Sequence, residues 1–239
     1  MNSFFIYIYL KIGMKKTLLF ISFSFSCILS FAQNEDQRSP LIDKVTGNIY
    51  ASQYVDVQGS QFLYDNWLNG MMELKNGVVF NNLQLKFDNY SNKFIANKGD
   101  KGYEITSDIH KVWIYPEISD TLFFENGFQI NSKINAGKFL QVLAEGKITL
   151  LKFANKELET YNEYGNANIL KRFRETPEYY IYKNGQYETV KLSKKDLEDK
   201  LSDKWPAVSA YLSKSGVSGK DEKGWAKAFQ YYNALSPGN

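Results

Sequence analysis

The stretch WLNGMMELKNGVVFNNLQLKFDNYSNKFIANKGDKGYEI, from Trp67 to Ile105, decides the fold class of this chain. Short apolar segments in it are separated by Asn-Gly, Asp-Asn-Tyr-Ser-Asn and Gly-Asp-Lys-Gly. Asn-Gly tolerates positive φ, and Asp, Asn and Ser side chains hydrogen-bond the backbone of turns. Leu83, Leu85 and Phe87 alternate with polar residues, which places three apolar side chains on one face of a strand. The stretch predicts four to five short antiparallel strands.

The same pattern continues on both sides of this stretch. Residues 45–57 alternate weakly and predict a first strand, and residues 109–115 predict another that ends at Pro116. Hairpins are expected over residues 122–130, around Asn126-Gly127, and over residues 139–153 and 179–192. Residues 155–168 are polar with interspersed tyrosines, and a loop is expected within them.

After residue 192 the pattern becomes helical. Ser193 and Asp196 resemble a capping box, and Pro206 suits the first turn of a second helix. A third helix is indicated by the apolar stripe of Trp225, Ala228, Phe229, Tyr232 and Leu235. Strands followed by helices, without alternation, predict an α+β fold. We expect an antiparallel β-meander sheet or half-barrel over residues 45–192, and two to three C-terminal helices in residues 193–239 that pack on the sheet.

The N-terminus has the pattern of a secretory signal peptide. Met14-Lys15-Lys16 begins a basic segment, Thr17–Leu29 is apolar, and Ser30-Phe31-Ala32 places small residues at positions −3 and −1 before Gln33. We therefore predict a signal peptide in residues 1–32, with the true start at Met14 and residues 1–13 as a spurious extension. An uncleaved anchor is the alternative. Residues 33–44 are interpreted as a mobile leader, and no transmembrane span is expected after cleavage.

Cysteine usage and charge restrict the function further. Cys27 is the only cysteine and lies in the signal region, where lipid attachment is the alternative to cleavage at Gln33. Residues 33–239 therefore contain no disulfide and no thiolate ligand or nucleophile. The first 32 residues contain three lysines and no acid, which leaves 26 of the 29 basic residues to balance 26 acidic ones. Neutral charge argues against nucleic-acid binding, which requires a basic surface.

No catalytic constellation is evident. His110 is the only histidine, which excludes most metal sites and Ser-His-Asp triads within the chain, and we interpret it as a strand residue. A carboxylate-dependent hydrolase is a minor alternative, and its candidate acids are Asp65, Asp88, Asp100, Glu104 and Asp108. Phosphate-binding and EF-hand motifs are absent from the sequence, so we predict no cofactor and no metal.

Aromatic residues are abundant, with 17 Tyr and 17 Phe. Most are expected to fill the core of the sheet. Consecutive tyrosines in one strand must occupy both of its faces, so one face can present tyrosine to a ligand. The candidate ligand-binding residues are Tyr179, Tyr180 and Tyr182, together with Trp113 in the strand before Pro116.

Three features carry a resemblance to a known family. These are the signal peptide ending Phe-Ala-Gln, the block GMMELKNGVVFNNLQLKFDNYSNKF and the terminal FQYYNAL. Together they resemble a group of exported envelope proteins of Bacteroidota that has no assigned activity. The resemblance implies compartment and fold, and it transfers no functional residues.

The expected function is therefore non-enzymatic. We expect an exported protein, periplasmic or associated with the outer membrane, that binds through an apolar or aromatic face of its sheet. A lipid or lipoprotein carrier is preferred by architectural analogy. The alternative is a module that binds an envelope protein or a glycan through the tyrosine strand.

Overall fold

The structure is a computed structural model that describes residues 49–52, 54, 56–99, 101–106, 108–162 and 169–235. All described residues belong to one compact unit, Leu41–Asn239. The predicted signal peptide, the mobile leader, Cys27 and Asp100 lie outside the described residues. Among the described residues, no helix is both long and apolar enough to cross a membrane.

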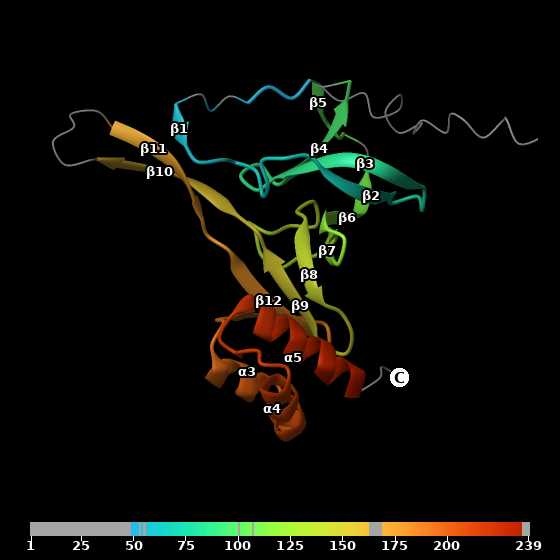
Figure 1. The fold of residues 1–239 in the computed structure, drawn as a ribbon, viewed down its shortest axis with the longest axis vertical. Coiled ribbons are helices and arrows are strands. Elements are labelled where there is room, and N and C mark those ends of the chain that lie inside the picture. Colours follow the sequence, from blue (N-terminus) through green and yellow to red (C-terminus); the bar gives the residue numbers. More distant parts are fainter. Residues whose placement is uncertain are drawn as a thin grey trace, which may run out of the picture. The chain divides into compact units, whose positions relative to one another are not determined.

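The fold is an α+β fold built on one large antiparallel sheet, as predicted (Figure 1). Ten strands hydrogen-bond in the order β13-β12-β9-β8-β7-β6-β2-β3-β4-β5. Their bounds are β2 Leu68–Leu74, β3 Val79–Asp88, β4 Lys93–Lys98, β5 Lys101–Glu104, β6 Ile109–Glu117, β7 Asp120–Glu125, β8 Leu140–Ala144, β9 Thr149–Phe153, β12 Glu178–Lys183 and β13 Gln186–Val190. The Trp67–Ile105 stretch supplies β2 to β5, which are four neighbouring strands at one end of this order.

Turn residues act at two of the predicted Asn-Gly pairs. Asn184 and Gly185 both have positive φ, of 52° and 81°, and connect β12 to β13 in a two-residue turn. At the β2–β3 turn only Gly77 has positive φ, and the Asn76 side chain accepts a hydrogen bond from the Val78 amide at 3.1 Å. Both pairs therefore form hairpins, as the sequence predicted.

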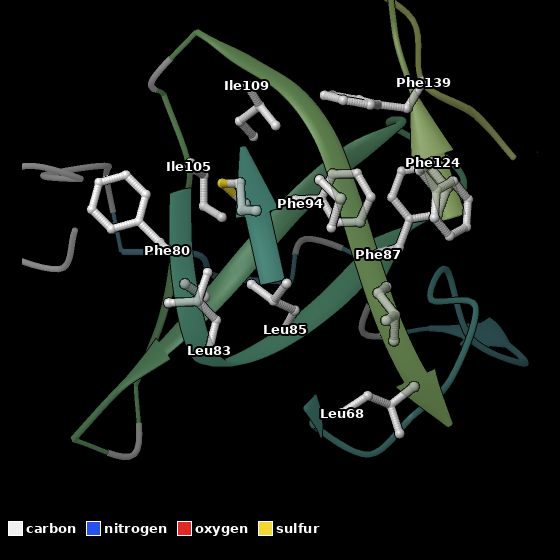
Figure 2. Close-up of a cluster of buried hydrophobic side chains, with 14 of the residues drawn as sticks. Leu68, Phe80, Leu83, Leu85, Phe87, Phe94, Ile105, Ile109, Phe124 and Phe139 are labelled. Carbon is white, nitrogen blue, oxygen red and sulfur yellow. The ribbon is translucent and has the colours of Figure 1, made fainter. Parts of the chain in front are cut away.

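The strands from β2 to β7 curl around one apolar core (Figure 2). Alternate residues of these strands point inward, and the phenylalanines among them contact one another directly. The Phe87 ring centroid lies 4.6 Å from that of Phe94 and 4.8 Å from that of Phe124. All three side chains are at most 1 % exposed. The inside of the curl is therefore filled by the chain's own aromatic rings.

Asn92 closes the curl by a pair of hydrogen bonds to a distant main chain. It ends the turn between β3 and β4 with a φ of 59°. Its Nδ2 donates to the Phe139 carbonyl at 2.9 Å, and its Oδ1 accepts from the Phe139 amide at 2.8 Å. The Phe139 ring then packs edge-on against Phe94, at 5.0 Å between centroids. One side chain thereby links the β3–β4 turn to the residue that precedes β8.

Three α-helices pack against the other half of the sheet: α3 Lys194–Lys200, α4 Trp205–Lys214 and α5 Glu222–Leu235, with a 3-10 helix η2 at Ser202–Lys204. Ser193 caps α3 by accepting from the Asp196 amide, as predicted, and Pro206 lies in the first turn of α4. α5 contacts β8 and β9. Four members of its predicted stripe are fully buried, whereas Leu235 is 37 % exposed.

A second asparagine fixes α5 to the sheet. Asn233 Oδ1 accepts from the Ile148 amide at 3.1 Å, and its Nδ2 donates to the Ile148 carbonyl at 2.9 Å. This is the same two-bond arrangement that Asn92 makes with Phe139. Both halves of the sheet are thus held by asparagine side chains bonded to main chain far away in the sequence.

The structure corrects the strand prediction at one place and refines it at two others. Residues 128–130 were predicted to pair with residues 122–124, but they form no strand, and β7 pairs with β6 instead. The segment from Asn126 to Phe139 packs its apolar side chains, Phe128, Ile130 and Ile134, over the sheet face opposite the helices. The segment 155–168, in which a loop was expected, begins with the strand β10 Lys156–Asn162, and residues 163–168 lie outside the described residues. β10 pairs with β11 Ile169–Glu175, and the ion pairs Glu157–Arg174 and Glu159–Arg172 join the two strands. Among the described residues of the region 45–57, Val57 alone lies in a strand, β1 Val57–Gln58, which runs parallel to β11, and Ile49 makes an isolated bridge to Tyr103.

The Asn92 bonds yield a stability prediction. Asn92→Gly keeps a residue that tolerates positive φ but removes both bonds to Phe139, so we expect a loss of about 2 kcal/mol in the free energy of unfolding by urea denaturation.

The matched control is Asn82→Gly. Asn82 has the same backbone conformation, with a φ of 56°, but its side chain is exposed. Its replacement should change stability by no more than about 0.5 kcal/mol. Equal losses for the two variants would show that the Asn92 side chain does not hold the curl.

Candidate functional site

The three predicted tyrosines of β12 have different environments. Tyr179 faces the helices, and its hydroxyl donates to Glu222 Oε2 at 2.7 Å; burial and this bond raise the pKa of the Tyr179 hydroxyl. Tyr180 faces the other side of the sheet, is 3 % exposed and donates to Glu178 Oε2 at 2.6 Å. Burial and that bond raise the pKa of Tyr180 to about 12. Tyr182 is 37 % exposed.

Trp113 belongs to a half-buried apolar row on the face opposite the helices. Strand pairing puts Trp113 between Met71 of β2 and Phe123 of β7. The Trp113 and Phe123 rings stack at 5.0 Å between centroids with an interplanar angle of 16°. We call Met71, Trp113 and Phe123 the outer row.

The structure does not gather the four predicted residues into one site. Tyr180, Tyr182 and Trp113 share a face of the sheet. The strand pairings place Phe124, Gln141, Lys152 and Tyr179 on one face, so their neighbours Phe123 and Tyr180 lie on the other, where Trp113 stacks on Phe123. However, β6 and β12 are four strand positions apart, about 19 Å at about 4.8 Å per strand. Two hydroxyls are also already bonded within the fold. Tyr179 and Tyr180 therefore have a structural role in the fold.

A pocket that the sequence did not reveal lies at one end of the curled sheet. It has a volume of about 360 Å³, within the range of small-molecule sites. Its apolar wall comes from the core residues Phe94, Ile105, Ile109 and Phe139. Figure 2 shows Ile109 and Phe139 at the edge of the cluster away from Leu68. We call this the Asn126 pocket.

Asn126 contributes the most unusual polar group of this pocket. Its backbone amide donates to the His110 carbonyl at 3.1 Å, and its side-chain Nδ2 donates to the Ile109 carbonyl at 2.7 Å. These bonds fix the side chain, because rotating the amide would bring Oδ1 against the Ile109 carbonyl. Asn126 is 8 % exposed, yet its Oδ1 has no hydrogen-bond partner. A buried acceptor without a partner is costly, and a bound molecule or water normally satisfies it.

Ser91 is a second lining residue of the pocket with an unpartnered side chain. Its amide donates to Asp88 Oδ1 at 2.9 Å, whereas its buried Oγ has no partner. Asp88 itself is fully occupied, since it also accepts from the Tyr90 amide and the Tyr50 hydroxyl, each at 2.9 Å. The turn between β3 and β4 therefore positions Ser91 at the pocket through Asp88.

Charged residues form the rim of the pocket. Lys93 pairs with Glu104 at 2.6 Å, and Lys75 pairs with Asp108 at 3.6 Å. Lys138 also lines the pocket and has no ion-pair partner in the described part of the chain. Three lysines against two carboxylates give the rim a net charge of +1.

Lys138 is held in place by its neighbours. Its amide donates to the Asn135 carbonyl at 2.9 Å, and Asn135 Oδ1 accepts from the Gly137 amide at 3.0 Å. Phe139, the next residue, is fixed by Asn92. The same contact that closes the curl therefore brings Lys138 to the pocket.

A second pocket, of about 350 Å³, adjoins the first. The two share Ser91, Lys93 and Glu104, so the Lys93–Glu104 pair separates them. Tyr50 and Tyr54 line the second pocket, and burial is the main cause that raises the pKa of both hydroxyls.

In the described part of the chain, the remaining predicted acids and His110 do not form a pair of catalytic groups that is free of lysine contacts. Glu104 and Asp108 line one pocket, but each contacts a lysine. Asp65 is exposed, and His110 Nε2 lies 3.4 Å from Glu125 Oε1 at a half-exposed position. In the ranges that the structure describes, no group of three His, Cys, Asp or Glu residues could hold a metal ion.

Comparison of the chain with known protein families, with curated proteins and with solved structures finds no match. The function must therefore be argued from the geometry of this chain alone.

The role of Tyr180 can be tested directly. Tyr180→Phe removes the bond to Glu178 and should lower the free energy of unfolding by about 1 kcal/mol, measured by urea denaturation. Tyr182→Phe is the control on the same strand face, and it should change stability by less than about 0.5 kcal/mol. A Tyr180→Phe variant as stable as the wild type would mean that this hydroxyl is available for binding.

Proposed function

We propose that this chain is a non-enzymatic, exported protein of the bacterial cell envelope that binds a small amphiphile in the Asn126 pocket. The observation that carries the proposal is a concave site with an apolar wall, a charged rim and a fixed, unpartnered acceptor at Asn126. Export, in the periplasm or at the outer membrane, rests on the signal-peptide pattern before Gln33.

The packed core determines where the ligand sits. A half-barrel carrier would hold an apolar guest inside the curl, but Phe87, Phe94 and Phe124 fill that space here. The Asn126 pocket offers both apolar and polar contacts at the end of the curl. A ligand with an apolar part and a polar head satisfies both.

The outer row supports a second candidate, the binding of an envelope protein. Trp113, Phe123 and Met71 are only half-buried, and apolar side chains presented together on a surface are typical of interaction sites. A glycan is less well matched to this row, because Trp113 and Phe123 stack face to face and each covers a face of the other. A carboxylate-dependent hydrolase is weaker still, since both acids of the pocket pair with lysine.

The main proposal is tested by what the protein carries when it is purified. The chain should be expressed from Met14 so that it is exported, and organic extracts of the folded protein should be analysed by mass spectrometry. We expect an amphiphile close to one per chain.

A pocket-filling variant supplies the control. Ser91→Trp places an indole in the pocket and should abolish the bound amphiphile, whereas Ser119→Trp, at the exposed β6–β7 turn, should retain it. Thermal melts establish that both variants fold. A ligand-free wild type, or equal ligand in wild type and Ser91→Trp, would contradict the proposal and direct attention to the outer row.

A further inference from the structure

We infer that the ligand of the Asn126 pocket has an anionic head with a hydrogen-bond donor beside it, as in a hydroxylated fatty acid. The inference rests on the proposed function and defines the chemistry of its ligand. It is drawn from three groups of the pocket, Lys138, Asn126 and Ser91.

The negative charge of the head is indicated by Lys138. Of the three lysines on the rim, Lys93 and Lys75 already contact Glu104 and Asp108. Lys138 has no such contact among the residues described, although it is partly buried and held by the Asn135 turn. An ammonium group in a partly enclosed site is stabilised by an anion, and such charge-assisted bonds are stronger than neutral ones.

Asn126 indicates that the ligand head also carries a hydrogen-bond donor. Its Oδ1 can only accept a hydrogen bond, and this buried atom has no partner in a residue that is 8 % exposed. A carboxylate or phosphate alone offers no donor to this oxygen, so an adjacent hydroxyl or amide group is required. Ser91 Oγ, which both donates and accepts, can bond either part of the head.

The apolar part of the ligand is inferred from the apolar wall of the pocket. Ile105, Ile109 and Phe139 are 5–8 % exposed, and they present hydrocarbon to the pocket beside the polar groups. Burial of each methylene of a chain against this wall is favourable, so a short chain is sufficient for measurable binding. A volume of about 360 Å³ accommodates a chain of medium length and excludes a complete two-chain lipid.

The test uses four soluble probes that share an eight-carbon chain: 3-hydroxyoctanoate, octanoate, octyl phosphate and octan-1-ol. Isothermal titration calorimetry on the folded mature protein gives each affinity. We expect 3-hydroxyoctanoate to bind about tenfold more tightly than octanoate, and octanoate about tenfold more tightly than octan-1-ol. Octyl phosphate distinguishes a phosphate head from a carboxylate, and tighter binding of either anion than of the alcohol supports the inference.

A matched pair of variants assigns the charge to Lys138. Lys138→Gln should weaken octanoate binding about tenfold and leave octan-1-ol unchanged, whereas Lys147→Gln, on the exposed β8–β9 turn, should alter neither. Binding of octanoate, and not of the alcohol, should weaken as salt is raised. Because the hydroxyl is varied on the ligand, the donor requirement is tested without changing Asn126.

The outcomes separate this inference from the proposed function. Equal affinity for octanoate, octyl phosphate and octan-1-ol would overturn the anionic head while the amphiphile site stands. Equal affinity for octanoate and 3-hydroxyoctanoate would overturn the donor. No saturable binding of any probe would overturn the proposed function itself.

Discussion

The hydrogen bonds from the Asn92 side chain to the Phe139 main chain are the interaction on which the candidate site depends. They join residues 47 positions apart and close the curl of β2 to β7. A flat sheet would leave one face of these strands in water, whereas the closed curl buries Phe94 and Phe139 against each other. Phe139 and Lys138 reach the Asn126 pocket only because this contact holds them there.

The packed core and the candidate pocket occupy different parts of the curl. Inside the curl, closely packed phenylalanines leave no room for a guest, and packing of this kind stabilises the fold. At its end, Asn126 and Ser91 line the pocket and each carries a buried oxygen without a hydrogen-bond partner, as Asn89 and Asn97 do elsewhere. Polar groups that remain unsatisfied in an otherwise well-bonded structure are typical of sites that bind something.

The fold could be predicted from the sequence further than the site could. Turn chemistry and strand alternation are local, so β2 to β5, the Asn184-Gly185 turn and the α5 stripe were predicted correctly. Asn126-Gly127 resembles those turns in sequence, yet the Asn126 side chain bonds the Ile109 carbonyl of another strand instead of closing a hairpin. Such long-range bonds have no local signature. The pocket was missed for this reason, and the tyrosines of β12 were favoured because their abundance was visible while their partners were not.

The Asn126 pocket is the site at which we propose that a small amphiphile binds. The most direct measurement is a titration of the ¹⁵N-labelled protein with octanoate, followed by amide chemical shifts in two-dimensional NMR. We expect saturable shifts at residues 91–94, 104, 105, 108, 109, 126 and 137–139, with none at Met71, Trp113 or Phe123. Shifts confined to that outer row, or no shifts at all, would contradict the proposal.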